Sequence, residues 1–102
     1  MSEGETSTVL ITGAAGQIGY ALAPMVCAGA ATGRSTKIAL RLLDVSFAAQ
    51  ALEGVKMELR DAAFDLVESV ECFTDADEAC ANVDVAIMVC GFPRKSGMES
   101  KE

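Results

Sequence analysis

The chain has 102 residues, of which 51% are hydrophobic, which is typical of one small packed domain or a piece of a larger one and not of a disordered segment. Its formal net charge of −7 argues against nucleic acid or an anionic membrane surface as a partner. The acidic start disfavours a secretory or mitochondrial leader, and no apolar run approaches the length of a membrane span. Four cysteines without C-x-x-C spacing and no histidine predict no metal site, reduced thiols buried as small hydrophobes, and a cytoplasmic location.

The first two elements are a strand and a helix. Residues 8–13 form a short apolar run that does not alternate, which predicts a strand buried on both faces. Residues 16–30 predict a helix, kinked at Pro24 and followed by a loop that Gly29 and Gly33 mark. Spacings of three and four give its expected buried face as Ile18, Ala21, Leu22, Met25 and Val26.

A second strand and helix follow the loop. Residues 38–44 predict a strand that is apolar apart from Arg41 and that ends in an acidic residue. Ser46 stands where it could cap the next helix, over residues 48–63. The apolar stripe of this helix is Ala48, Leu52, Val55, Leu59 and Ala62.

The rest of the chain repeats this alternation. Residues 70–74 predict a short strand, Asp75 and Asp77 suit the start of a brief helix to about Cys80, and residues 83–90 predict another strand. Strands alternating with helices imply a parallel sheet of the α/β class. We therefore expect residues 1–102 to be the N-terminal part of a Rossmann-type dinucleotide-binding domain, with about four strands forming the first half of a doubly wound fold and no catalytic domain.

A glycine-rich turn links the first strand and helix. Gly13 permits a tight turn, Gly16 lets the backbone approach a pyrophosphate, and Gly19 lets helix and strand pack closely. The alternative is a tight strand-to-helix turn without a ligand. The expected cofactor contacts here are Gly13, Ala14, Ala15, Gly16, Gln17, Ile18 and Gly19.

Asp44 ends the second strand, 25 residues after Gly19. A carboxylate at this place accepts hydrogen bonds from the adenosine ribose hydroxyls and repels a 2′-phosphate, which favours NAD over NADP. The alternative is an aspartate that only caps the following helix.

The loop after the last predicted strand, residues 91–97, leaves the carboxyl end of that strand, where open parallel sheets bind ligands. Gly91 is a further expected cofactor contact, and Arg94 offers a planar fork suited to a substrate carboxylate. Lys95 adds positive charge, and Gly97 suits a hinge for a moving lid. The alternative is a solvated basic surface loop.

Four sequence blocks occur in this order: TGAAGQIG at 12–19, LLD at 42–44, MELRDAA at 57–63 and GFPRKSGM at 91–98. Together they resemble the N-terminal third of the cytosolic-type NAD-dependent malate dehydrogenases. The resemblance implies NAD in the glycine turn, the adenosine ribose on Asp44, and the distal carboxylate of malate or oxaloacetate on Arg94. It further implies a homodimer with the helix at 48–63 near the subunit contact. Hydride transfer to nicotinamide is paired in this family with a His–Asp couple that handles the hydroxyl proton.

The sequence departs from the family pattern at two points. Ser100 stands where the family has a second arginine that polarises the substrate carbonyl, and loss of such a donor costs on the order of 10²–10³-fold in rate. The chain contains no histidine, so no catalytic residue is assigned and the 102 residues alone are expected to be inactive. Two other interpretations stay open: a fragment of an extended short-chain dehydrogenase or epimerase, and a non-catalytic nucleotide-binding module.

Overall fold

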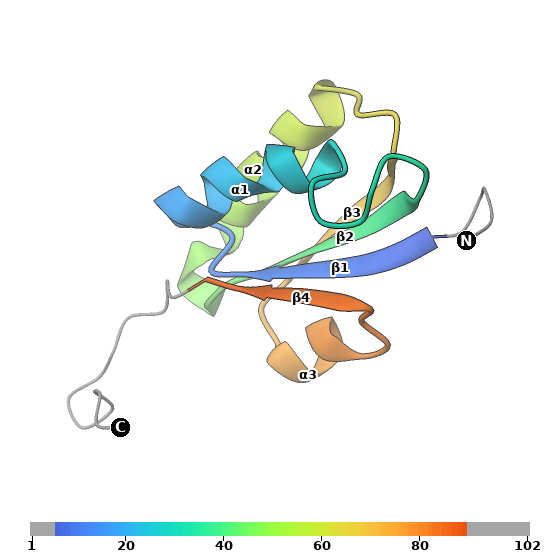
Figure 1. The fold of residues 1–102 in the computed structure, drawn as a ribbon. Coiled ribbons are helices and arrows are strands. Elements are labelled where there is room, and N and C mark those ends of the chain that lie inside the picture. Colours follow the sequence, from blue (N-terminus) through green and yellow to red (C-terminus); the bar gives the residue numbers. More distant parts are fainter. Residues whose placement is uncertain (1–5, 90–102) are drawn as a thin grey trace.

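The computed structural model describes residues 6–89 of the chain. Within this part, four parallel strands form one sheet in the order β3-β2-β1-β4. The strands are β1 (Thr6–Thr12), β2 (Lys37–Leu43), β3 (Val67–Phe73) and β4 (Val85–Met88). Helices α1 (Gln17–Cys27) and α2 (Ala49–Asp61) cover one face and the short α3 (Ala76–Cys80) covers the other (Figure 1). The predicted parallel α/β sheet is confirmed.

The centre of the sheet is buried on both faces, as the non-alternating run in β1 predicts. Val9 and Ile11 pack with the larger hydrophobic cluster, beneath α1 and α2, whereas Leu10 packs with Leu43 and Ala79 on the α3 face. Burial of each such aliphatic side chain contributes about 1.5–3 kcal/mol. β1 is therefore a rigid base for the turn that leaves its carboxyl end.

Helix α1 ends at Cys27, three residues before the predicted end at residue 30. Gly29 adopts a left-handed φ of +100°, its N–H donates to the Val26 carbonyl at 3.0 Å, and the Ala30 N–H donates to the Met25 carbonyl at 3.1 Å. These two bonds form a Schellman motif, which satisfies the last carbonyls and turns the chain away from the helix.

The predicted buried face of α1 is largely wrong. The structure buries Ala23, Val26 and Cys27, whereas Ile18 is 62% and Met25 is 55% exposed. Apolar residues surround nearly the whole helix, so spacing alone does not select one face. The helix therefore presents a second apolar face to its surroundings.

Ser46 does not cap α2. It begins a 3₁₀ turn, η1 (Ser46–Ala48), and the N-cap of α2 is Ala48, without a side-chain hydrogen bond. The Ala48 N–H donates instead to the Val45 carbonyl at 2.9 Å, which brings the chain round from β2 into the helix. The central part of the predicted stripe, Leu52, Val55 and Leu59, is buried as expected.

The edge strands differ in length from the prediction. β3 begins at Val67 instead of residue 70. The sequence does not reveal this earlier start, because Glu68 and Ser69, which are exposed at the sheet edge, interrupt the apolar run. β4 is shorter than 83–90. At its start the Asp84 carboxylate accepts the Thr8 N–H at 2.8 Å, in place of a backbone carbonyl.

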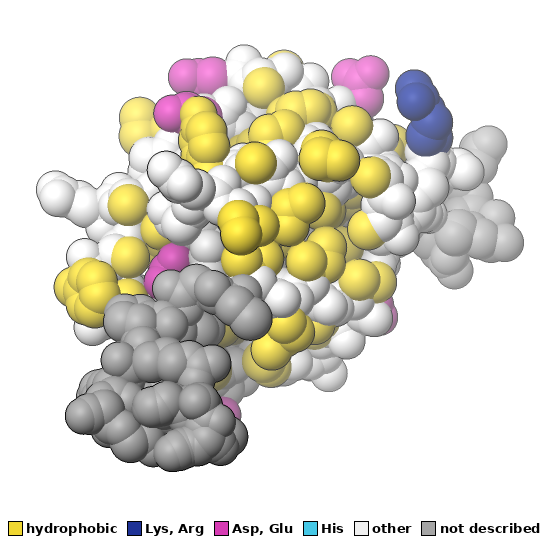
Figure 2. Space-filling view, turned by 60° about the vertical axis from the view of Figure 1, so that its left-hand side comes forward, with side chains coloured by type: hydrophobic (Ala, Val, Ile, Leu, Met, Phe, Trp, Pro, Cys, Tyr) yellow, Lys and Arg dark blue, Asp and Glu magenta, His cyan; other side chains and the backbone are white. Residues whose placement is uncertain are grey.

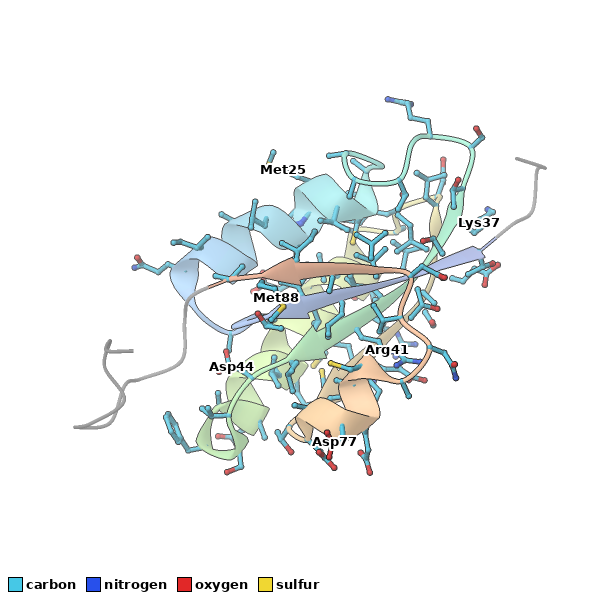
Figure 3. The ribbon with its side chains drawn as sticks, turned by 60° about the horizontal axis from the view of Figure 1, so that its bottom comes forward. Met25, Lys37, Arg41, Asp44, Asp77 and Met88 are labelled. Carbon is cyan, nitrogen blue, oxygen red and sulfur yellow. The ribbon has the colours of Figure 1, made fainter. Side chains whose placement is uncertain are left out.

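The expected start of the acidic helix is confirmed, since the Asp75 carboxylate accepts the Asp77 N–H at 3.0 Å. Arg41, the polar residue in the second strand, holds the other end. Its side chain lies beside α3 (Figure 3). The guanidinium donates to the carbonyls of Ala79 at 2.8 Å and Ala81 at 2.7 Å and lies over the Phe73 ring. A cation is favourable at a helix C-terminus, so Arg41 fastens α3 to the sheet.

Candidate functional site

The glycine turn leaves the sheet at the carboxyl end of β1. Gly13 has a left-handed φ of +66°, and the Gly16 N–H donates back to the Gly13 carbonyl at 3.1 Å. The turn is tied to β2 by the Ala14 N–H, which donates to the Leu43 carbonyl at 3.1 Å. The reversal therefore happens within a few residues, and α1 starts directly above the strand end.

The N-terminus of α1 is suited to an anion. Gly16 is the N-cap and supplies no side chain to cap the helix, and the first helical bond runs from the Tyr20 N–H to the Gly16 carbonyl at 2.9 Å. The amides of the first turn, at Gln17 and Ile18, have no acceptor inside the helix. Together with the helix dipole, these N–H groups attract phosphate oxygens.

The glycines at the two ends of this helical turn have different roles. A Cβ on Gly19 would lie 2.5 Å from the Gly13 carbonyl oxygen and 2.7 Å from the Ala14 Cα, both fixed backbone atoms. Glycine is therefore required there for packing, as predicted. A Cβ on the exposed Gly16 would meet only the Gly13 oxygen, at an ordinary 3.5 Å, so the protein's own packing leaves space on that side for a ligand.

Asp44 lies beside this turn (Figure 3). The residue is only 6% exposed. One carboxylate oxygen accepts the Ala15 N–H at 2.9 Å and the other accepts the Val45 N–H at 2.8 Å. The side chain does not cap the following helix, so that alternative is wrong. Each carboxylate oxygen has a second lone pair, which leaves acceptor capacity for a ribose hydroxyl. Asp44 therefore also shapes the glycine turn, a role that residue spacing does not indicate.

Three of the predicted site residues fall on a segment without a described structure. Gly91, Arg94 and Ser100 lie outside residues 6–89. The structure does bring the turn at 13–19 and Asp44 together. The hydrogen bond between them joins Ala15 and Asp44, which are 29 residues apart in the sequence.

The thiols differ more than the sequence suggests. Cys27 is buried and Cys72 is half-buried, and burial raises the pKa of each thiol to about 11. Cys80, by contrast, is exposed, so it does not fit the expectation of a buried small hydrophobe. Cys90 lies outside the described residues.

Residues 6–89 contain neither a membrane-spanning helix nor a metal-binding cluster. No helix there has the length and apolar character that a membrane crossing needs. The same residues contain no cluster of three or more His, Cys, Asp or Glu side chains placed to hold a metal ion.

An uncapped helix after a glycine turn, with a carboxylate at the end of the neighbouring parallel strand, defines a dinucleotide-binding α/β domain. The model of the family described as "lactate/malate dehydrogenase, NAD binding domain" matches residues 7–102. The chain belongs to this family. The match favours a member of the lactate/malate dehydrogenase family over a fragment of an extended short-chain dehydrogenase or epimerase.

Relatives of known name agree with this assignment. The chain is 60% identical over 94 residues to a malate dehydrogenase of Nicotiana tabacum, with 92% of the chain and 28% of the relative covered. It is 57% identical over 98 residues to a cytoplasmic malate dehydrogenase of Zea mays, with 96% and 30% covered. The chain thus spans less than a third of the length of these relatives.

Solved structures of malate and lactate dehydrogenases also resemble the chain. A malate dehydrogenase of Naegleria fowleri superposes with a TM-score of 0.85 at 38% identity, over 97% of this chain and 30% of that one. A lactate dehydrogenase of Trichomonas vaginalis in complex with NADH and oxamate superposes with a TM-score of 0.79 at 38% identity, over 89% and 27%.

Proposed function

We propose that the protein is a cytoplasmic NAD-dependent malate dehydrogenase, which oxidises malate reversibly to oxaloacetate. The observation that supports this most strongly is the uncapped N-terminus of α1 beside Asp44, in a chain of the lactate/malate dehydrogenase family. The names of the Nicotiana and Zea relatives favour malate as the substrate, and the name of the latter favours the cytoplasm. Residues 1–102 would supply the N-terminal part of the NAD-binding domain.

The chain's own groups suggest how NAD would be held. The pyrophosphate would lie on the N–H groups of Gln17 and Ile18, with Gly16 providing the space for its approach. The adenosine ribose would donate hydroxyl protons to the remaining lone pairs of Asp44. When bound, NAD supplies the hydride acceptor, and the protein contributes binding and orientation.

Asp44 would also select NAD over NADP. Its carboxylate lies at the end of β2, so a 2′-phosphate placed there would meet a negative charge at short range. This supports an enzyme that works with NAD.

The substrate would bind beyond the described residues. Arg94 offers a bidentate partner for the distal carboxylate of malate, which distinguishes a dicarboxylate from lactate. Ser100 replaces the arginine that the family uses to polarise the carbonyl, and with no histidine in the chain the proton-transfer group is not among these 102 residues.

A homodimer is the proposed assembly. Ile18 and Met25 are exposed on one side of α1, and Tyr20 is exposed on the side toward α2. Figure 2 shows hydrophobic side chains over much of one face of the molecule. A mainly apolar groove of about 310 Å³ lies between α1 and α2, beside the Tyr20 hydroxyl, which donates to Glu58 at 2.6 Å. That contact, with the Glu58 charge, raises the pKa of Tyr20 above its ordinary value. A second copy covering this surface would remove apolar area from water.

The test is a steady-state assay of the protein expressed from its complete reading frame. NADH oxidation is followed with oxaloacetate or pyruvate as substrate, and then with NADPH in place of NADH. We expect turnover with oxaloacetate and NADH, and an Arg94→Gln variant that loses the preference for oxaloacetate over pyruvate.

Three outcomes would contradict the proposal in different ways. NADH binding without turnover on any 2-oxo acid would indicate a non-catalytic nucleotide-binding module. A preference for pyruvate would replace the substrate. A Ser100→Arg variant no faster than the parent would show that Ser100 does not occupy the position of the missing arginine.

A further inference from the structure

The backbone pairing between β1 and β4 ends just short of the glycine turn. The last paired residues are Thr12 and Met88. Gly13, with its left-handed φ of +66°, then leads the chain out of the sheet. Val89, the next residue on the β4 side, therefore lies beyond the backbone pairing of the two strands.

The side chain of Thr12 takes over this pairing. Its hydroxyl oxygen accepts the Val89 N–H at 2.9 Å, and the hydroxyl lies 3.5 Å from the Val89 carbonyl oxygen, a long donor contact. Thr12 is 3% exposed and Val89 is 8% exposed, so water does not compete for these groups. The shorter bond carries most of the stabilisation, because hydrogen bonds weaken steeply beyond normal distances.

This contact completes a set of anchors on the glycine turn. On the β2 side, the turn is bonded through the Ala14 N–H to Leu43 and through the Ala15 N–H to Asp44. Thr12, the last residue before the turn, provides the bond on the β4 side. The turn is thus bonded to both neighbouring strands by the protein's own groups.

We propose that Thr12 is a positioning residue for coenzyme binding: its hydroxyl holds the carboxyl end of β4 against the glycine turn. The inference rests on the proposed function, since it concerns the crevice between these strand ends. A binding site fixed before the ligand arrives costs less ordering on binding, and affinity rises accordingly. Thr12 itself touches no substrate or coenzyme in this role and acts through the position of Val89.

The chain allows matched variants. Thr12→Val keeps the shape and removes the hydroxyl, which leaves the buried Val89 N–H without its acceptor. Thr12→Ser keeps the hydroxyl and removes only the methyl group. Thr8→Val makes the same exchange at the other end of β1, where the threonine contacts are made by backbone atoms to Asp84.

Dissociation constants for NADH and the separate kcat and KM values would be measured below the unfolding temperature of every variant. We expect Thr12→Val to weaken NADH binding and raise the KM for NADH by about 3- to 30-fold, with a smaller change in kcat, as for the loss of one buried hydrogen bond. Thr12→Ser should restore affinity to within about threefold, and Thr8→Val should bind like the parent.

Hydrogen exchange on the parent protein provides a test that no folding defect can affect. The Val89 amide should be protected as strongly as the paired amides of β4, even without NADH. Fast exchange at Val89, or a folded Thr12→Val with parental affinity, would overturn the role of Thr12. A parent protein that binds no NADH would overturn the proposed function instead, and the two failures are therefore distinguishable.

Discussion

Asp44→Ala removes a carboxylate that has two kinds of partner. In the structure it accepts the N–H groups of Ala15 at 2.9 Å and Val45 at 2.8 Å, and in the proposed complex it also accepts ribose hydroxyls. The first kind shapes the glycine turn in the free protein. The second kind exists only with a bound dinucleotide, so stability and coenzyme choice report on them separately.

The effect on stability follows from the two partly buried amides that donate to the carboxylate. The carboxylate is 6% exposed, and a buried donor left without its acceptor costs about 1–3 kcal/mol. Because water can reach partly buried amides in part, we expect the free energy of unfolding to fall by about 1–3 kcal/mol in Asp44→Ala. The distorted turn should weaken NADH and NADPH binding alike.

The charge of Asp44 acts on the difference between the two coenzymes. At about 5 Å and an effective dielectric constant of about 20, a carboxylate repels each unit charge of a 2′-phosphate by roughly 3 kcal/mol. Solvent and salt at the edge of the sheet reduce this value, so the preference for NADH over NADPH should narrow by about 10- to 100-fold.

Calorimetric titration of the parent, Asp44→Ala and Asp44→Asn with both coenzymes measures this preference, and urea unfolding measures the stability. Asp44→Asn removes the charge but keeps one acceptor oxygen and the shape. It should therefore narrow the coenzyme preference with a smaller loss of stability. A preference that stays the same in both variants would refute the ribose assignment. Parental stability of Asp44→Ala would refute the importance of the turn contacts.

Three other predictions concern the rest of the described chain. Gly19→Ala places a Cβ against fixed backbone and should lower the free energy of unfolding by more than about 2 kcal/mol in urea titration. Gly16→Ala should lower it by no more than about 1 kcal/mol and yet weaken NADH binding. Equal stability of the two variants would contradict the steric argument. Arg41→Met should lower the free energy of unfolding by about 1.5–3 kcal/mol and speed amide hydrogen exchange more in α3 than in the other elements. Unchanged exchange in α3 would show that the guanidinium does not stabilise this helix. Burial raises the pKa of Cys27 to about 11, so iodoacetamide at pH 8 should modify the exposed Cys80 well before Cys27. Peptide mass spectrometry measures the order of modification, and the reverse order would contradict the burial of Cys27.

The sequence predicts the fold well because its signals are local. The unbroken apolar run in β1 and the glycine spacing after it require only neighbouring residues to be recognised, and both are found in the structure. Asp44 is predicted at the right strand end for the same reason. Its bond to Ala15 is not predicted, because it joins positions 29 residues apart through a side chain.

The errors arise where local signals compete or are absent. Helix α1 is apolar on nearly all sides, so its buried face depends on where the sheet lies and not on spacing. Its end is fixed by the left-handed Gly29, a position that the sequence marks as loop but not as the residue that stops the helix. Thr12 reads as an ordinary strand residue, and only its distance to Val89 shows that the side chain continues the pairing where Gly13 leaves the sheet.

In the proposed complex, the N-terminus of α1 holds the pyrophosphate of NAD. The most direct test is to titrate the isotopically labelled protein with NADH and to follow its backbone amide resonances. The predicted result is that the amides of Gly16, Gln17 and Ile18 shift most, together with Val45 beside the Asp44 carboxylate, and that NADPH at the same concentration produces much smaller shifts. Saturating NADH that leaves these amides unchanged, or shifts only resonances elsewhere, would contradict it.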